Sequence, residues 1–185
     1  MEQRELVERA RRGDHDAFAQ LAAGAITRLD AAARLILRDR ELARDAVQEA
    51  LVRAWRDLPG LRDPDRFDAW LHRLIVRACI DQARIRGRRP IEVEIDPILD
   101  APTPDETQAI ADRDQIDRVL AHLTPEHRAL VVLHYYLELP LPEAAGMLGI
   151  PLGTAKSRLH RAIGSLRRTF DPDTREIDLE GGRLA

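Results

Sequence analysis

This chain of 185 residues has little of what several common classes of protein require. Its single cysteine, Cys79, excludes an intramolecular disulfide and a cysteine-based zinc site. Aromatic residues make up only 4% of the chain, and alternating runs of β-branched residues are nearly missing, so a β-sheet protein is not expected. No stretch is long and apolar enough to span a membrane, and the charged N-terminus is unlike a signal peptide. We therefore expect a cytoplasmic protein.

Alanine, leucine and arginine are abundant instead, and apolar residues recur at helical spacing, which predicts an all-α protein. The formal net charge of −3 is unevenly distributed. Residues 91–114 carry eight acidic side chains and one basic one, whereas residues 1–90 and 115–170 each carry more basic than acidic side chains. Because a local field matters more than the total charge, the negative sum does not exclude binding to nucleic acid.

The most informative stretch, residues 139–168, predicts two helices joined by a tight turn. Gly149 can adopt the left-handed conformation that ends the first helix, and Ala145 is small enough for a second helix to cross closely. The apolar residues of the second helix recur at helical spacing and should form one buried stripe: Ala155, Leu159, Ala162, Ile163 and Leu166. This arrangement is a helix-turn-helix.

Away from that stripe, the second helix carries polar and basic side chains: Lys156, Ser157, Arg158, His160 and Arg161. Arginine and lysine can bind guanine edges in the DNA major groove and neutralise phosphates. The pattern therefore favours DNA contact through this face. A solvated basic face on a small helical bundle is the alternative interpretation.

In the first half of the chain, Asp14 and Asp39 are typical N-caps for helices that run to about residues 38 and 58. The second of these helices has an exposed polar patch formed by Asp45, Gln48 and Glu49. Either it is an ordinary solvated face or it is a docking surface for a partner helix, and spacing alone does not choose between the two. His15 and Asp16 form a pair that metal-dependent phosphohydrolases use. No second such pair lies at ligand spacing, so a capping turn is favoured.

A turn-rich loop at residues 58–65 precedes a third long helix, in which Phe67 and Trp70 lie on the apolar side. Polar residues occupy the remainder: Arg66, Arg73, Arg77, Asp81 and Arg84. Aromatic rings beside arginines suit single-stranded DNA, because bases stack on the rings while guanidinium groups hold the backbone. The alternative is that both aromatic residues belong wholly to the core.

The composition changes again between residues 90 and 114, where prolines and acidic residues leave no helical period and predict a flexible linker. Thr124 and Pro125 then suit the start of a helix that runs to about Leu137, which is apolar nearly all round and should form the core of a second domain. We therefore expect domains at residues 1–89 and 115–170, with an acidic tail at 171–185.

These motifs, in this order, resemble an extracytoplasmic-function sigma factor, the smallest type of bacterial RNA polymerase sigma subunit. Residues 45–56 resemble the helix that binds core polymerase, residues 67–81 the helix that melts the promoter and reads the −10 element, and residues 123–162 the domain that reads the −35 element. The linker is too short for the additional domain of larger sigma factors.

The resemblance implies a non-enzymatic specificity subunit that needs no cofactor or metal and does not itself insert into a membrane. Its partners would be core RNA polymerase, promoter DNA and an anti-sigma factor. Core polymerase would contact Asp45, Gln48 and Glu49, and the −35 element would contact the exposed face of residues 156–161. The −10 strand would contact Arg66, Phe67, Trp70, Arg73, Arg77, Asp81 and Arg84, with one base flipped into the loop at residues 62–68.

Two rival hypotheses remain. The first is a stand-alone helix-turn-helix regulator that acts without polymerase, which would bind promoter duplex tightly by itself. The second is a metal phosphohydrolase built on His15 and Asp16, which would contain a stoichiometric divalent ion.

Overall fold

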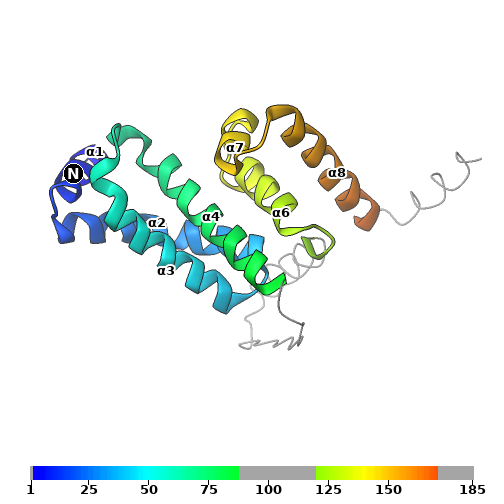
Figure 1. Ribbon diagram of the computed structural model, residues 1–185, viewed down its shortest axis with the longest axis horizontal. Helices are drawn as coiled ribbons and strands as arrows, with labels where there is room; N and C mark the ends of the chain where they lie inside the picture. The colour runs from blue at the N-terminus through cyan, green and yellow to red at the C-terminus, as the bar shows by residue number, and fades with distance from the viewer. Residues whose placement is uncertain (1, 88–119, 171–185) are drawn as a thin grey trace, which may run out of the picture.

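A computed structural model describes residues 2–87 and 120–170, and the described parts of the chain contain helices and no strands (Figure 1). The first group of helices is α1 (Gln3–Arg11), α2 (His15–Leu37), α3 (Arg40–Asp57) and α4 (Phe67–Gly87). Two 3₁₀ turns, Leu58–Gly60 and Pro64–Arg66, connect α3 to α4. The second group is α6 (Pro125–Val131), a π-helical turn (Val132–Tyr136), α7 (Leu141–Leu148) and α8 (Leu152–Phe170). The all-α prediction is confirmed. The predicted linker and tail lie outside the described residues.

The predicted helix starts are made by side-chain caps. Asp14 accepts a hydrogen bond from the Ala17 N–H at 3.0 Å, and Asp39 accepts one from the Leu42 N–H at 2.9 Å. At α6, Thr124 accepts a longer bond of 3.4 Å from the next turn. Each cap satisfies one of the backbone donors that a helix N-terminus leaves without an intrahelical partner, which fixes where the helix begins.

Gly149 ends α7 as predicted. Its φ of 66° is left-handed, a conformation that costs glycine little. The chain turns back so that the Ile150 N–H donates to the Ala145 carbonyl at 3.0 Å. This turn sets the angle at which α8 leaves α7, so it positions the second helix of the helix-turn-helix.

The helix that was expected to run from Pro125 to Leu137 ends differently. After Val131 the backbone widens into a π-helical turn, closed by a bond from the Leu137 N–H to the Val132 carbonyl at 2.9 Å. The extra residue in this turn moves the following side chains out of register with the buried face of α6. As a result, Tyr135 and Tyr136 are 57% and 40% exposed, so the helix that was predicted to be apolar nearly all round and to form the core is only partly buried at its C-terminal end.

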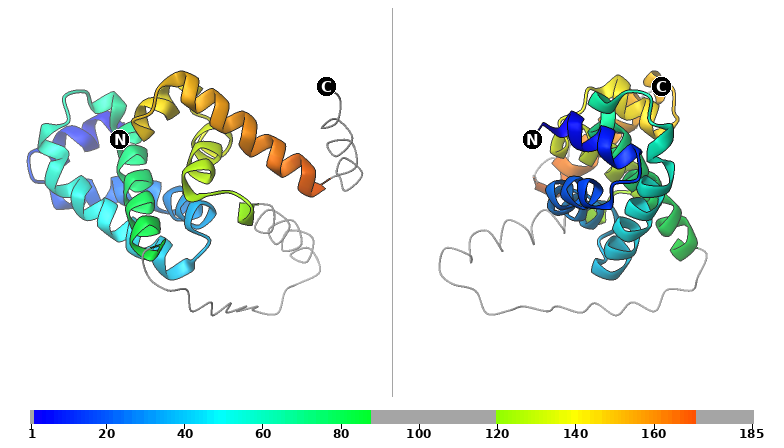
Figure 2. Two further views of the ribbon diagram at one scale, coloured as in Figure 1. Left: turned by 45° about the vertical axis from the view of Figure 1, so that its right-hand side comes forward. Right: turned by 90° about the vertical axis from the view of Figure 1, so that its left-hand side faces the viewer.

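The two groups of helices are not separate in space. One continuous cluster of buried residues extends from α1–α4 into the second group, where Leu130, Leu133 and Ala145 belong to it. Leu35 of α2 also packs against a smaller cluster that contains Leu120 and Ala162. In both Figure 1 and Figure 2, α6 and α7 lie beside α4. The sequence predicted two domains but not this shared core.

Candidate nucleic-acid interface

The exposed face of α8 lies where the sequence placed it. Ala155, Leu159 and Ala162 are buried against the rest of the molecule. On the opposite side of the helix, the exposed residues are Lys156, Ser157, His160 and Arg161, while Arg158 is half-buried. The face is basic, and it is presented by the second helix of a helix-turn-helix, which is the geometry that fits a DNA major groove.

Arg161 is held loosely along α8. Its Nε donates to the Ser157 carbonyl at 3.3 Å, and its Nη2 lies 3.5 Å from the Ser157 Oγ. Ser157 in turn donates to the Thr154 carbonyl at 3.0 Å. Among the described residues, neither Lys156 nor Arg161 pairs with a carboxylate, so the positive charge of this face is available to a phosphate or a base.

The electrostatic effect of this face is seen at His127, at the start of α6. Burial lowers the pKa of His127, and the positive charges of Arg158 and Arg161 lower it further. These effects favour the neutral form of His127. The positive field of Arg158 and Arg161 thus extends to the start of α6.

The candidate −10 residues form a second face, on α4. Arg66, at the end of the preceding turn, and the helix positions Trp70, Arg73, Arg77, Asp81 and Arg84 recur every three or four residues, so they share one side. The four arginines and the aspartate are exposed, and Trp70 is half-buried. Phe67 is only 1% exposed, so it offers no free ring face to a base and stabilises the core instead.

Part of the α4 face is covered by the second group of helices. The guanidinium of Arg73 donates to the Gly146 carbonyl of α7 at 2.9 Å. The exposed Arg66 pairs with Asp63 at 3.6 Å, and Asp81 lies 4.0 Å from Arg53 of α3. The structure thus brings the candidate −10 residues other than Phe67 onto one helix face, but it places α7 against the middle of that face.

The loop that leads into α4 is fixed at several points. The Asp63 carboxylate accepts from the Asp65 N–H at 3.1 Å, and Asp65 pairs with Arg4 of α1 at 2.9 Å. A further bond joins Gln3 of α1 to Asp68 at 2.7 Å. α1 therefore supports the 62–68 loop, a role that sequence reasoning did not assign to it.

The polar patch on α3 is a third candidate surface. Asp45 and Gln48 are exposed, whereas Glu49 is half-buried because it pairs with Arg53 of the same helix. Arg53 also faces Asp81 of α4, so Glu49 belongs to a small network that links α3 to α4. The patch predicted from spacing exists, but its three members are not equally available to a partner.

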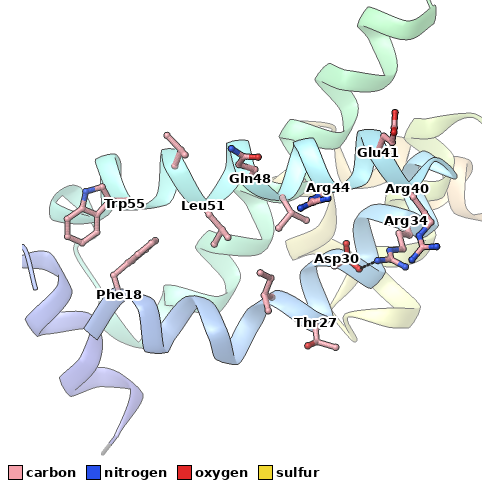
Figure 3. A pocket seen from close by; sticks show the side chains of 13 residues that line it. Phe18, Thr27, Asp30, Arg34, Arg40, Glu41, Arg44, Gln48, Leu51 and Trp55 are labelled. Atoms are coloured by element: carbon pink, nitrogen blue, oxygen red, sulfur yellow. Dashed lines mark ion pairs between the residues drawn. The ribbon is translucent and has the colours of Figure 1, made fainter. Parts of the chain in front are cut away.

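Sequence reasoning missed a groove beside this patch. It lies between α2 and α3, has a volume of about 1020 Å³, and has Gln48 on its edge (Figure 3). Its apolar part includes Ile26 and Val52, which are 43% and 61% exposed. Its other end carries the charged side chains Asp30, Arg34, Arg40, Glu41 and Arg44. Ile26 and Val52 could have signalled it, because both are apolar residues outside the buried stripes of their helices.

His15, the residue on which the metal hypothesis depends, stacks on Trp55 with 4.3 Å between ring centroids, next to the Asp14 cap. In residues 2–87 and 120–170, no group of three or more histidine, cysteine, aspartate or glutamate side chains is arranged to hold a metal ion. None of the described helices combines the length and the apolar character that a membrane-spanning helix needs.

A helix-turn-helix with a basic exposed face, together with an arginine-rich helical unit, is typical of a DNA-binding protein that acts in transcription. Comparison with known families identifies which one. Residues 26–89 match the family model described as "Sigma-70 region 2", and residues 113–166 match "Sigma-70, region 4". The chain belongs to the extracytoplasmic-function family of RNA polymerase sigma factors.

Its relatives support this assignment. The chain is 35% identical over 160 residues to the "RNA polymerase sigma-E factor" of Streptomyces avermitilis, covering 83% of this chain and 88% of the relative. It is 36% identical over 157 residues to the "ECF RNA polymerase sigma factor SigM" of Mycobacterium tuberculosis, covering 84% and 78%. As a sigma factor, the protein directs core RNA polymerase to specific promoters and initiates transcription, and none of these comparisons favours a stand-alone regulator.

Solved structures agree on the fold. CnrH, in a complex with the cytosolic domain of CnrY, superposes with a TM-score of 0.68 at 30% identity, covering 92% of this chain and 98% of CnrH. The sigma factor RpoE of Bartonella quintana, in a complex with the anti-sigma factor NepR, superposes with a TM-score of 0.64 at 24% identity, covering 82% and 94%. At that lower identity, the second likeness concerns the fold alone.

Proposed function

We propose that three surfaces of this sigma factor divide promoter recognition and opening between them. The α3 patch binds core polymerase, the α4 face holds the displaced −10 strand, and the exposed face of α8 reads the −35 duplex. The domains involved are residues 1–89 and 115–170, joined by the 90–114 linker and followed by the 171–185 tail. The observation that carries the proposal is the exposed basic face of α8, opposite a buried stripe, in a helix-turn-helix that matches sigma region 4.

On α8, the contacts with the −35 element come from Lys156, Ser157, Arg158, His160 and Arg161. Arg161 is the candidate for reading a base, because its planar fork can donate to guanine O6 and N7 together. Lys156 lies more than one turn nearer the helix N-terminus and is assigned to a phosphate. Such contacts release counterions from DNA, so binding should weaken as salt increases.

On α4, the exposed arginines suit the backbone of a single strand, and the half-buried ring of Trp70 can receive a base on its exposed part. Phe67 contributes by holding the helix in the core. The 62–68 loop is the candidate pocket for a flipped base, and its ties to α1 through Arg4 and Gln3 would keep it in place.

On α3, the acidic patch would repel DNA phosphates, which favours a protein partner. Asp45 and Gln48 provide polar contacts, and the adjacent groove with Val52 provides apolar area. An exposed apolar groove with a polar edge is typical of a protein interface. We assign this surface to core polymerase.

As a specificity subunit, the protein would have no enzymatic activity of its own and would act in the cytoplasm, where polymerase and DNA are found. The solved relative CnrH is in a complex with the cytosolic domain of CnrY. We infer that the activity of this chain is also restrained by an anti-sigma partner.

The core-binding assignment is tested by reversing charge on α3. Asp45→Lys with Glu49→Lys should abolish co-purification with core polymerase while the helical circular dichroism spectrum is retained. The matched control is Glu2→Lys with Glu5→Lys, which changes the net charge equally at exposed positions on and just before α1. Unchanged affinity for core polymerase in the folded α3 variant would show that the patch has another role.

A further inference from the structure

A cavity between α1, α2 and α4 takes no part in the three proposed surfaces. α1 packs on α2 and on the turn that precedes α4, at the N-terminal end of the molecule (Figure 1). The cavity lies where these helices meet and has a volume of about 350 Å³. That volume is at the lower end of the range for pockets that bind small molecules. The size therefore fits a metabolite rather than a helix of a partner protein.

The cavity has an apolar floor and a polar rim, as small-molecule sites generally do. Leu21 and Phe67 of the floor are 6% and 1% exposed, so both are held in the core. The rim consists of polar side chains that come from all three helices: Gln3, Gln20, Arg28, Asp68 and His72. Several hydrogen-bonding groups thus meet at one small site.

His72 has a buried atom that lacks a partner. Its Nδ1 forms no hydrogen bond within the part of the chain that the structure describes. A buried polar atom without a hydrogen bond is destabilising, and native proteins contain few of them. Burial and then the charge of Arg28 lower the pKa of His72, which favours the neutral ring. The neutral ring has one donating and one accepting nitrogen, so Nδ1 can bond to a ligand in either role.

Two opposite charges lie beside this ring. After burial, Arg28 lowers the pKa of His72 and Asp68 raises it, so both charges are near the ring. Among the described residues, Arg28 pairs with no carboxylate. One oxygen of Asp68 accepts from Gln3 at 2.7 Å, which leaves the other oxygen for a ligand. The cavity thus offers a cation to an anionic group and, separately, an acceptor to an N–H donor.

The cavity is on the opposite side of α4 from the proposed −10 face. An α-helix turns by about 100° per residue. Asp68 and His72, two residues before and after Trp70, therefore lie nearly opposite to it. A strand that follows Trp70, Arg73 and Arg77 does not pass over the cavity. A ligand of this cavity would reach it as a free small molecule.

We propose that this cavity binds a small metabolite that carries an anionic group and, at its other end, an N–H donor. Arg28 binds the anion, Asp68 accepts from the N–H donor, and the Nδ1 of His72 bonds to a polar group between them. Two kinds of molecule have this chemistry. A free α-amino acid has a carboxylate and an ammonium, and a nucleoside monophosphate has a phosphate and the N–H groups of its base. Binding needs neither polymerase nor DNA, so failure of the proposed promoter contacts would leave it intact.

The first test exposes the free full-length chain to both kinds of molecule. Single proteinogenic amino acids form one set of probes, and the ribonucleoside monophosphates form the other. One set should contain a probe that raises the melting temperature, because a ligand that binds only the folded state stabilises it. The same probe should shift the imidazole signals of His72 in the nitrogen NMR spectrum until they saturate, and His72→Gln identifies those signals. If no probe gives a saturable shift, the proposal is wrong.

Substitutions at the two charges test the contacts. Arg28→Gln and Asp68→Asn each remove a charge at an exposed position, so the fold should be retained, and the asparagine still offers an oxygen to Gln3. Each should weaken binding of the active probe by about tenfold or more, as expected when a charged hydrogen-bond partner is lost. Arg34→Gln removes the same charge from an exposed position of α2 outside the cavity and should leave the affinity unchanged. An equal loss in Arg28→Gln and Arg34→Gln would indicate unspecific attraction and overturn the proposal.

A single-stranded −10 oligonucleotide is the final probe, because it separates this cavity from the −10 site. It should leave the His72 signals in place, both alone and when the cavity is saturated with the active probe. If the oligonucleotide shifts these signals and neither set of small molecules does, the cavity belongs to the −10 site and the proposal is wrong.

Discussion

Arg161 provides the sharpest test of how α8 reads DNA, because three substitutions at two positions separate base reading from attraction. Arg161→Ala removes the fork and the charge. Arg161→Lys keeps the charge and loses the fork. Lys156→Ala removes a charge assigned to a phosphate. If Arg161 binds a guanine, both of its variants should relax preference at the same single −35 position, whereas Lys156→Ala should weaken all sequences alike.

The size of the effect follows from what Arg161 must give up. Its two contacts, at 3.3 and 3.5 Å from Ser157, are long and exposed, so releasing them should cost well under about 1 kcal/mol. A bidentate contact with guanine contributes about 1–3 kcal/mol of discrimination. At about 1.4 kcal/mol per factor of ten, the preferred base should lose an advantage of roughly 5-fold to 150-fold.

The measurement is transcription by the assembled holoenzyme from promoters that carry each single-base change in the −35 element, at two salt concentrations. Lys156→Ala should reduce the slope of log affinity against log salt by about 0.9, the value for one phosphate contact. Arg161→Lys should leave that slope nearly unchanged. A uniform loss for Arg161→Ala, with no position relaxed, would refute base reading and assign Arg161 to the DNA backbone.

Three further outcomes are expected. Arg73→Ala with Arg77→Ala should impair open-complex formation, and a promoter with a pre-melted bubble should restore much of it; a lack of rescue would place these arginines in another step. Asp14→Ala should lower the melting temperature at pH 7. The hydrogen bond from the Ala17 N–H and then Arg9 lower the pKa of Asp14 in the folded state below its ordinary value of 3.8. The contribution of the Asp14 carboxylate to stability is therefore complete above pH 3.8 and is lost as the pH falls through the lowered pKa. Below that pH, the melting temperatures of the variant and the unmodified chain should converge. Burial raises the pKa of the Cys79 thiol to about 12, so at pH 8 it should react with maleimide roughly a thousandfold more slowly in the folded chain than in denaturant; fast labelling of the folded chain would contradict its burial.

The local features of this fold were predictable because short-range chemistry determines them. Asp14, Asp39 and Thr124 cap helices where their types predict, and Gly149 ends α7 in the left-handed conformation that glycine adopts at little cost. The buried and exposed sides of α8 also follow from period alone. These features position the −35 candidate face, so that part of the site was visible in the sequence.

What the sequence did not indicate depends on contacts between distant residues. Nothing around Arg128 marks it as buried, because its three acceptors are backbone carbonyls, and carbonyls have no signature in a sequence. For the same reason, the contact between Arg73 and Gly146, 73 residues apart, could not be predicted. The sequence pattern did not distinguish between a Phe67 that is exposed to DNA and one that is buried in the core. Packing between the helices buries it.

The exposed tyrosines of the π-helical turn also have a spectroscopic consequence. The chain has two tyrosines, Tyr135 and Tyr136, both in the second group of helices, and two tryptophans, Trp55 and Trp70, both in the first. Tyrosine emission overlaps tryptophan absorption, so excited tyrosines in one group can transfer energy to tryptophans in the other when the two are close. Denaturation, which separates the two groups, should therefore brighten tyrosine emission, so the unlabelled protein reports by its own fluorescence whether the two groups of helices are packed together.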